Sequence, residues 1–173
     1  IAFTAGLLSA GLLAASPSAA LAADAAADAD DSARILKLVT DFYTDYIQCS
    51  DQEKDPCNGE NIPAFLAKRP DVDPEFTQKM TGLVTNAYKE PDGEGLEFDP
   101  ILLAQDTPEK TSYDKPIITG DSAEMIMHKG SAEFPSVACI ALIKKGGAWR
   151  IRDIIDMDDE NRPACGGLSA GKK

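Results

Sequence analysis

The chain has 173 residues, of which 29 are acidic and 17 are basic, and its formal net charge is −12. This balance argues against nucleic acid and anionic membrane surfaces as partners, because both attract clustered Lys and Arg. A basic protein partner is compatible with it, although acidity is more often a source of solubility.

The first 22 residues contain no charged residue, and an apolar stretch within them ends in small residues. This pattern is typical of a secretory signal peptide, and we expect cleavage after Ala22. A transmembrane anchor is the alternative, but the apolar run is short and interrupted. The sequence predicts a signal peptide at 1–22, a disordered leader at 23–31, a single domain at 32–165 and a flexible tail at 166–173. We expect the mature protein to be periplasmic or secreted.

In an exported chain, four cysteines are expected to form disulfides rather than to bind metal. Three pairings are possible. Cys49 and Cys57 flank a polar loop, Cys139 lies in an apolar run and Cys165 lies in a Gly-rich segment. We therefore predict the pairs Cys49–Cys57 and Cys139–Cys165. A redox pair or a zinc site has little support, since no C-x-x-C occurs and His128 is the one histidine.

Two helices are predicted in the first half of the chain. Apolar residues recur at spacings of three and four between residues 32 and 48, which indicates an amphipathic helix with a broad apolar face. A short helical turn is expected near 62–66. The run Asp73-Pro74-Glu75 combines an N-cap residue, Pro at the first helical position and an acid in the first turn. It predicts the start of a second long helix, which Pro91 should end.

The second half of the chain has the pattern of strands. Apolar residues occupy 117–119, alternate with polar ones over 123–128, run almost continuously over 137–143 and alternate again over 149–156. Glycine-containing turns separate these segments. Helices followed by a meander of strands predict an α+β fold, in which N-terminal helices pack on a curved antiparallel sheet of about four strands.

The sequence contains no Gly-x-Ser-x-Gly, Walker or His-Glu-x-x-His pattern. A general base is one interpretation of His128, but strand alternation favours a surface histidine. The acidic run 156–161 suggests calcium, yet it lacks the glycine and the acid that an EF-hand loop requires at fixed positions. The sequence thus favours a protein without a metal, a cofactor or enzymatic activity.

The segment 98–106 places apolar residues beside polar ones, between the predicted helices and the predicted sheet. Two interpretations stay open. In one, Asp99, Gln105 and Asp106 form a small-ligand site together with Tyr43 of the first helix. In the other, Asp99 caps a turn, and Gln105 and Asp106 satisfy backbone groups where the chain crosses from the helices to the sheet.

Four segments, at 38–43, 96–106, 120–123 and 147–154, occur in an order that resembles a bacterial family of exported domains of unknown function. This family includes YbjP-type envelope lipoproteins. The most specific part of the resemblance is the D-P-x-L-x-x-Q-D pattern at 99–106. The resemblance implies an NTF2-like or cystatin-like fold in the periplasm or on its membranes, and no known reaction. This chain lacks the lipid-acceptor cysteine of the lipoprotein members, so we expect a soluble periplasmic protein.

Two functions are compatible with these observations. The first is a non-enzymatic binding or interaction module of the cell envelope, with an envelope protein or an exported toxin as its partner; an immunity-type inhibitor falls in this class. The alternative is a small-ligand-binding protein or an enzyme that uses an NTF2-like pocket.

Overall fold

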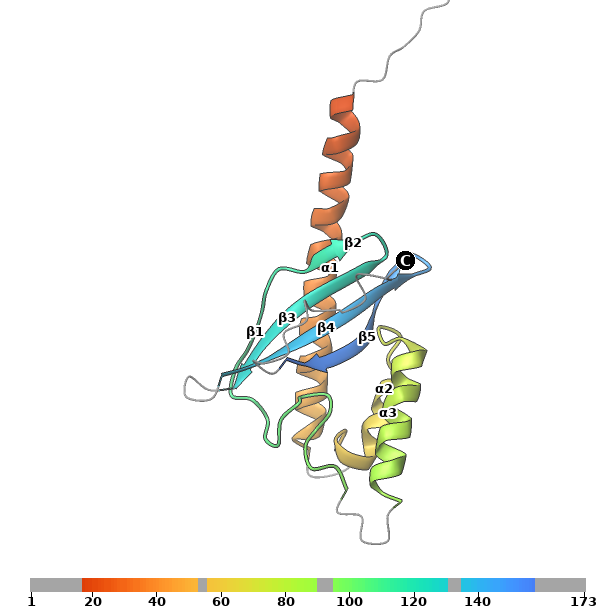
Figure 1. The fold of residues 1–173 in the computed structure, drawn as a ribbon, viewed down its shortest axis with the longest axis vertical. Coiled ribbons are helices and arrows are strands. Elements are labelled where there is room, and N and C mark those ends of the chain that lie inside the picture. The colour runs from red at the N-terminus through yellow and green to blue at the C-terminus, as the bar shows by residue number, and fades with distance from the viewer. Residues whose placement is uncertain (1–16, 53–55, 90–94, 131–134, 158–173) are drawn as a thin grey trace, which may run out of the picture.

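The computed structural model describes residues 17–52, 56–89, 95–130 and 135–157, with helices first and a sheet after them (Figure 1). This arrangement confirms the predicted α+β fold. The helical elements are α1 Pro17–Ser50, the 3-10 turn η1 Gly59–Asn61, α2 Ile62–Ala67 and α3 Pro74–Ala87. The strands are β1 Thr111–Tyr113, β2 Ile117–Thr119, β3 Ser122–Gly130, β4 Pro135–Lys145 and β5 Ala148–Asp156.

The sheet is antiparallel throughout, in the order β1-β3-β4-β5, and β2 also pairs with β3. The short strands β1 and β2 therefore share one edge of β3: Thr111 lies opposite Lys129, and Ile117 lies opposite Glu124. The sequence did not predict β1, because three residues are too few to show alternation. On β5, Asp153 pairs with Ala141 whereas Ile151 pairs with the next residue of β4, so one extra residue of β5 forms a bulge.

The second half of α1 lies across one face of the sheet, while its first half projects past the sheet edge (Figure 1). Five apolar residues of the second half are at most 1% exposed: Ile35, Val39, Phe42, Tyr43 and Tyr46. They pack in one cluster with the inward-facing residues of the strands. Burial of this face is the main source of fold stability, at roughly 25 cal/mol per Å² of apolar surface.

The structure begins α1 at Pro17, so residues 23–31 are helical although the sequence predicts a disordered leader there. Alanine has the highest helix propensity, and neither Gly nor Pro interrupts the chain between residues 18 and 50. At the end of this segment, the Asp31 carboxylate lies 2.6 Å from the Lys144 ammonium of β4. That hydrogen bond lowers the pKa of Asp31, with the Trp149 indole and the Lys144 charge acting in the same direction. The division into signal peptide and mature domain stays a prediction.

The connection between α2 and α3 is bonded to the outer edge of β5. Val72 forms a parallel bridge with Ile151: the Asp73 N–H donates to the Ile151 carbonyl, and the Ile151 N–H donates to the Asp71 carbonyl, both at 2.8 Å. As the sequence predicts, Asp73 is the N-cap of α3, and its side chain accepts from the Glu75 N–H at 3.0 Å. The helix ends at Ala87, before the predicted stop.

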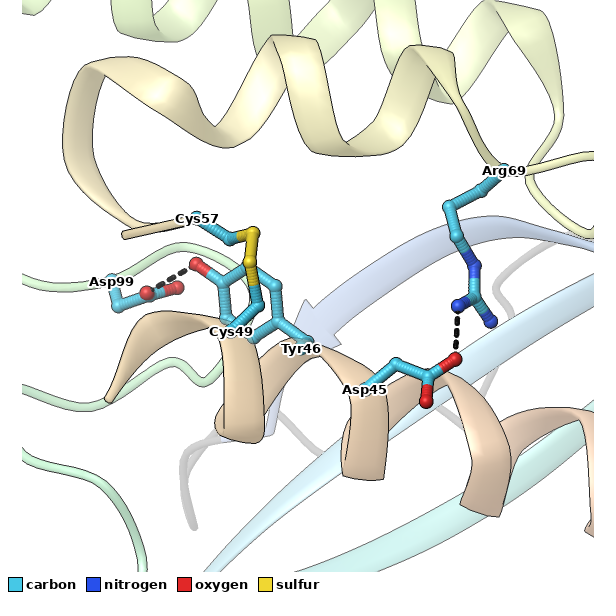
Figure 2. Close-up of a disulfide and its surroundings, with 6 residues drawn as sticks. All are labelled: Asp45, Tyr46, Cys49, Cys57, Arg69 and Asp99. Carbon is cyan, nitrogen blue, oxygen red and sulfur yellow. Dashed lines mark hydrogen bonds and ion pairs between the residues drawn. A yellow bond between two sulfur atoms is a disulfide. The ribbon is translucent and has the colours of Figure 1, made fainter. Parts of the chain in front are cut away.

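A disulfide between Cys49 and Cys57 closes the loop that follows α1, with 5.4 Å between the two Cα atoms (Figure 2). This pair confirms the first predicted disulfide. Cys139 is fully buried on β4 and is not free. Its predicted partner, Cys165, lies outside the described residues, so the second pair stays a prediction. Across the described ranges, no helix has the length and apolar character needed to cross a membrane.

Asp73 should give the protein a defined acid sensitivity. Burial by itself would raise the pKa of its carboxyl, but the Lys145 ammonium at 2.7 Å and the Glu75 N–H together lower it from the ordinary 3.8. An ionised carboxylate whose pKa is lower in the folded state than in the unfolded state stabilises the fold. This stabilisation is present above pH 3.8 and is lost as the pH falls through the folded-state pKa.

We expect Asp73→Asn, which can still cap the helix, to reduce the free energy of unfolding more at pH 7 than at pH 2, as measured by urea denaturation. Asp73→Ala should lose about 1–2 kcal/mol more at neutral pH because the cap is gone as well. An equal effect of Asp73→Asn at both pH values would contradict this account.

The Cys49–Cys57 disulfide closes a short loop, and we expect Cys49→Ser to lower the free energy of unfolding of the oxidised protein by about 2–3 kcal/mol. The reason is the larger conformational entropy of the unfolded chain once the cross-link is absent. Thermal denaturation with and without reductant is the measurement. The variant and the wild type should differ in oxidised samples and coincide in reduced ones.

Candidate functional site

The segment Asp99 to Ala104 forms a tight turn, which we call the box turn (residues 99–104). The Asp99 carboxylate accepts from the N–H groups of Ile101 at 2.7 Å and Leu102 at 3.1 Å through one oxygen. The Asp99 carbonyl accepts from the Leu103 N–H at 2.7 Å, and the Asp99 N–H donates to the Ala104 carbonyl at 2.9 Å. Backbone and side chain of one aspartate thus bond to four residues of the turn.

Three side chains from distant elements hold the box turn against the core. The Tyr46 hydroxyl of α1 donates to the second carboxylate oxygen of Asp99 at 2.5 Å (Figure 2). The Tyr43 hydroxyl donates to the Ile101 carbonyl at 3.3 Å. From β3, the Lys129 ammonium donates to the Leu103 carbonyl at 2.6 Å and to the Ser136 hydroxyl at 3.0 Å. The turn is therefore fixed from both the helix side and the sheet side.

Burial shifts the pKa values of these three groups. It raises the pKa of Tyr43 and of Tyr46 from their ordinary 10.0, and the negative charge of Asp99 raises both further. A phenol is protonated at neutral pH even at its ordinary pKa of 10.0, and the raised pKa extends the range over which both hydroxyls act as donors. Burial lowers the pKa of Lys129 from 10.5, while the charge of Asp156 opposes that shift.

Leu103 has a φ of 51°, in the left-handed region that residues other than glycine rarely adopt. Such a conformation is held only where the surroundings enforce it, and it is common at functional sites. Here both backbone groups of Leu103 are bonded, the N–H to Asp99 and the carbonyl to Lys129. These bonds stabilise the direction in which the chain leaves the turn.

The four predicted ligand residues fall into two groups in the structure, one engaged in contacts within the protein and one exposed. The Asp99 side chain caps the turn, as in the capping interpretation, and the Tyr43 hydroxyl donates to the Ile101 carbonyl inside the protein. Gln105 and Asp106 come directly after the box turn, and both are exposed. The first two residues therefore build the turn, and the last two lie on the surface that it supports.

Two surface hollows flank the turn, and Gln105 lines both. The first, which we call the acidic hollow, has a volume of about 290 Å³. Its walls come from the disulfide loop, the end of α3 and the segment 96–107, and the charged residues among its described lining are Asp51, Glu97 and Asp99. The second hollow, of about 400 Å³, is lined by the end of the box turn, Lys129 and Ser136, and also by two acids, Asp106 and Glu109.

Two large aromatic side chains stand at the acidic hollow. Phe98 is 48% exposed and Tyr88 is 44% exposed, and both belong to its lining. Exposed aromatic groups beside a concave surface are a common feature of protein-binding sites. Sequence reasoning did not identify either residue as part of a site.

Sequence reasoning also missed Tyr46 and Lys129. Tyr46 was assigned only to the apolar face of its helix. Lys129 continues the alternation of Ala123, Met125 and Met127, and all four are at most 6% exposed. Strand alternation could therefore have identified Lys129 as an inward-facing lysine that needs a buried acceptor.

The remaining candidates carry no recognised chemistry. The His128 imidazole lies 3.0 Å from the Asp114 carboxylate, and both side chains are about half exposed, at 49% and 58%. This arrangement agrees with a surface histidine. Within the described ranges, no three His, Cys, Asp or Glu residues are arranged so that they could hold a metal ion.

No protein-family model and no curated protein matches the chain. Among solved structures, it is similar to a chain in the crystal structure of the type VI native effector–immunity complex Tae3–Tai3 from Ralstonia pickettii. The TM-score is 0.51 at 20% sequence identity, and the match covers 71% of this chain and 94% of that chain. At this level of identity the likeness shows a shared fold.

Tyr46→Phe should test the attachment of the box turn to α1. Loss of the hydroxyl leaves a partly buried carboxylate oxygen of Asp99 without its donor, which should lower the free energy of unfolding by about 1–3 kcal/mol. Amide hydrogen exchange at Ile101 and Leu102 should become faster than in the wild type. Tyr43→Phe is the matched control, and its effect should be smaller because its hydrogen bond is longer and ends on a neutral carbonyl. Unchanged exchange in Tyr46→Phe would show that the turn does not depend on this bond.

Proposed function

We propose that this protein is an immunity-like interaction module of the cell envelope, which binds and inhibits an exported effector protein. The observation that carries the proposal is the box turn. It is held by side chains from α1 and β3, and it supports the exposed residues Phe98, Gln105 and Asp106. A loop that is already ordered loses little conformational entropy on binding, which favours a tight complex.

The fold comparison supports the same class of function. A chain with this fold occurs in a solved complex of a type VI effector with its immunity protein. The predicted signal peptide and the Cys49–Cys57 disulfide favour an exported protein, and the resemblance to envelope lipoproteins points to the same compartment. The net charge of −12 is compatible with a basic partner.

The alternative, a small-ligand protein or enzyme with an NTF2-like pocket, has less support. Of its four predicted ligand residues, Tyr43 and Asp99 direct their polar atoms at protein groups. Asp99 accepts three hydrogen bonds from the protein, two on one oxygen and one on the other, which leaves little capacity for a ligand.

The test is protection of cells from an exported effector. Each type VI effector encoded by the same genome is directed to the periplasm of a host strain, with or without this protein. We expect co-export of this protein to restore growth against one of them, and the purified pair to bind at nanomolar concentrations. The same protein without residues 1–22 should not protect, because it stays in the cytoplasm. If none of the effectors is bound or neutralised by the folded, oxidised protein, the proposed function is wrong.

A further inference from the structure

We propose that the acidic hollow receives a cationic side chain, Arg or Lys, of the protein partner, with Phe98 and Tyr88 packing against its stem and charged head. The inference rests on the proposed function, since it assumes a protein partner, and it names the chemistry that this partner presents.

The aromatic groups supply the first argument. Within the described ranges, the large hydrophobic side chains that are exposed are Leu36, Leu83, Tyr88, Phe98 and Ile117, and two of them line this one hollow. Aromatic rings attract cations over their faces and pack well against the methylene groups of Arg and Lys. An Arg or Lys side chain bound in the hollow would bury the exposed rings of Tyr88 and Phe98.

Two glycines pack closely against the side chain of Tyr88. Gly59 and Gly95 have φ values of 58° and 82°, and a Cβ on either would come within 3.0 Å of the Tyr88 ring or hydroxyl. Glycine at both positions lets the backbone approach the tyrosine closely. The aromatic wall of the hollow is thus held in place from two sides rather than lying loosely on the surface.

The charge of the lining selects a cation. Among the described residues that line it, the ionisable groups apart from the Tyr88 phenol are the carboxylates of Asp51, Glu97 and Asp99, and none of these described residues is basic. Asp99 is occupied by hydrogen bonds within the box turn. Asp51 and Glu97 are free of ion pairs within the part of the chain that the structure describes, where Asp51 accepts only a long hydrogen bond from Thr107 at 3.4 Å. An acidic side chain of a partner would be repelled here.

The same chemistry already occurs inside this protein. The Arg69 guanidinium lies 5.5 Å from the centre of the Phe42 ring and 5.6 Å from that of Phe65. It also bonds the carboxylates of Asp45 and Asp71 (Figure 2 shows the bond to Asp45). Two aromatic rings and two carboxylates thus hold an internal arginine. The acidic hollow offers two rings and two available carboxylates, and no cationic side chain among the described residues lines it.

The size of the hollow favours a side chain over a cofactor. Its volume of about 290 Å³ lies at the lower end of small-molecule sites, which span roughly 300–1,000 Å³. The second hollow is a weaker candidate, because Lys129 already donates to two acceptors and the acids Asp106 and Glu109 share its lining.

An NMR titration tests the chemistry of the hollow without the effector. N-acetyl-arginine amide is added to the oxidised, isotope-labelled protein, and N-acetyl-citrulline amide, which has the same shape but no charge, is the control ligand. We expect amide shifts for Asp51, Glu97, Phe98 and Gln105 with the arginine compound and not with the citrulline compound. The shifts should weaken at high ionic strength.

Matched variants locate the site. Asp51→Asn with Glu97→Gln should weaken binding of the arginine compound about 10-fold. Asp121→Asn with Glu75→Gln removes the same charge at the opposite end of the molecule and should leave binding unchanged. Phe98→Ala should weaken binding, whereas Ile117→Ala, which truncates an exposed residue of β2, should not. If both charge variants lose the same amount of affinity for the arginine compound, then net charge alone explains the binding and the proposal is wrong.

The effector experiment separates this inference from the proposed function. If the wild type neutralises an effector and the Asp51→Asn/Glu97→Gln variant binds that effector equally well, the function stands and the proposed role of the hollow is wrong. If the arginine compound binds at the hollow but no effector is neutralised, the function fails and the assignment of an effector side chain fails with it. We expect the charge variant to weaken effector binding about 10-fold or more, mainly through faster dissociation.

Discussion

The hydrogen bond between Tyr46 and Asp99 is the constraint on which the site depends. It joins two segments that are 53 residues apart, the buried face of α1 and the start of the box turn. Tyr46 lies one helical turn before Cys49, whose disulfide fixes the loop that carries Asp51. Because both links start from the same end of α1, they hold opposite walls of the acidic hollow relative to each other.

The residues around the box turn divide into those that hold it and those that it displays. Tyr43, Tyr46 and Lys129 come from the core, and both phenols donate to the box turn, one to the Ile101 carbonyl and the other to the Asp99 carboxylate. Their hydrogen bonds offset the unfavourable backbone conformation of Leu103. A residue other than glycine adopts this conformation at a cost of about 1–3 kcal/mol. Phe98, Gln105 and Asp106 remain exposed. A surface of this kind is ordered before a partner arrives, which is the condition for binding with little entropic loss.

Much of the fold could be predicted from the sequence because it depends on local patterns. The spacing of apolar residues identified the buried part of α1, the Asp73-Pro74 pair identified the start of α3, and alternation identified β3 and β5. The loop between Cys49 and Cys57 is short enough for a local disulfide, which the structure confirms. The exceptions have physical reasons: β1 is too short for a period, and the helix continues into residues 23–31 because alanine favours it.

The site was less predictable because its contacts are long-range and end on backbone atoms. Periodicity shows that Tyr46 and Lys129 are buried, but it does not show that they donate to Asp99 and to the Leu103 carbonyl. The acidic D-P-x-L-x-x-Q-D pattern was recognised, and its role as a small-ligand site or as a cap was left open. Only the fold brings the pattern beside Tyr88 and the disulfide loop.

Ion pairing distinguishes two acids near the β4–β5 hairpin from two acids at the acidic hollow. At the opposite end, acids are paired with lysines of the β4–β5 hairpin: Asp31 with Lys144 and Asp73 with Lys145. Around the acidic hollow, Asp51 and Glu97 have no such partner in the described ranges. Two carboxylates without an ion pair beside exposed aromatic rings produce a local negative potential, which would accelerate the approach of the basic partner that we propose and orient it toward the ordered turn.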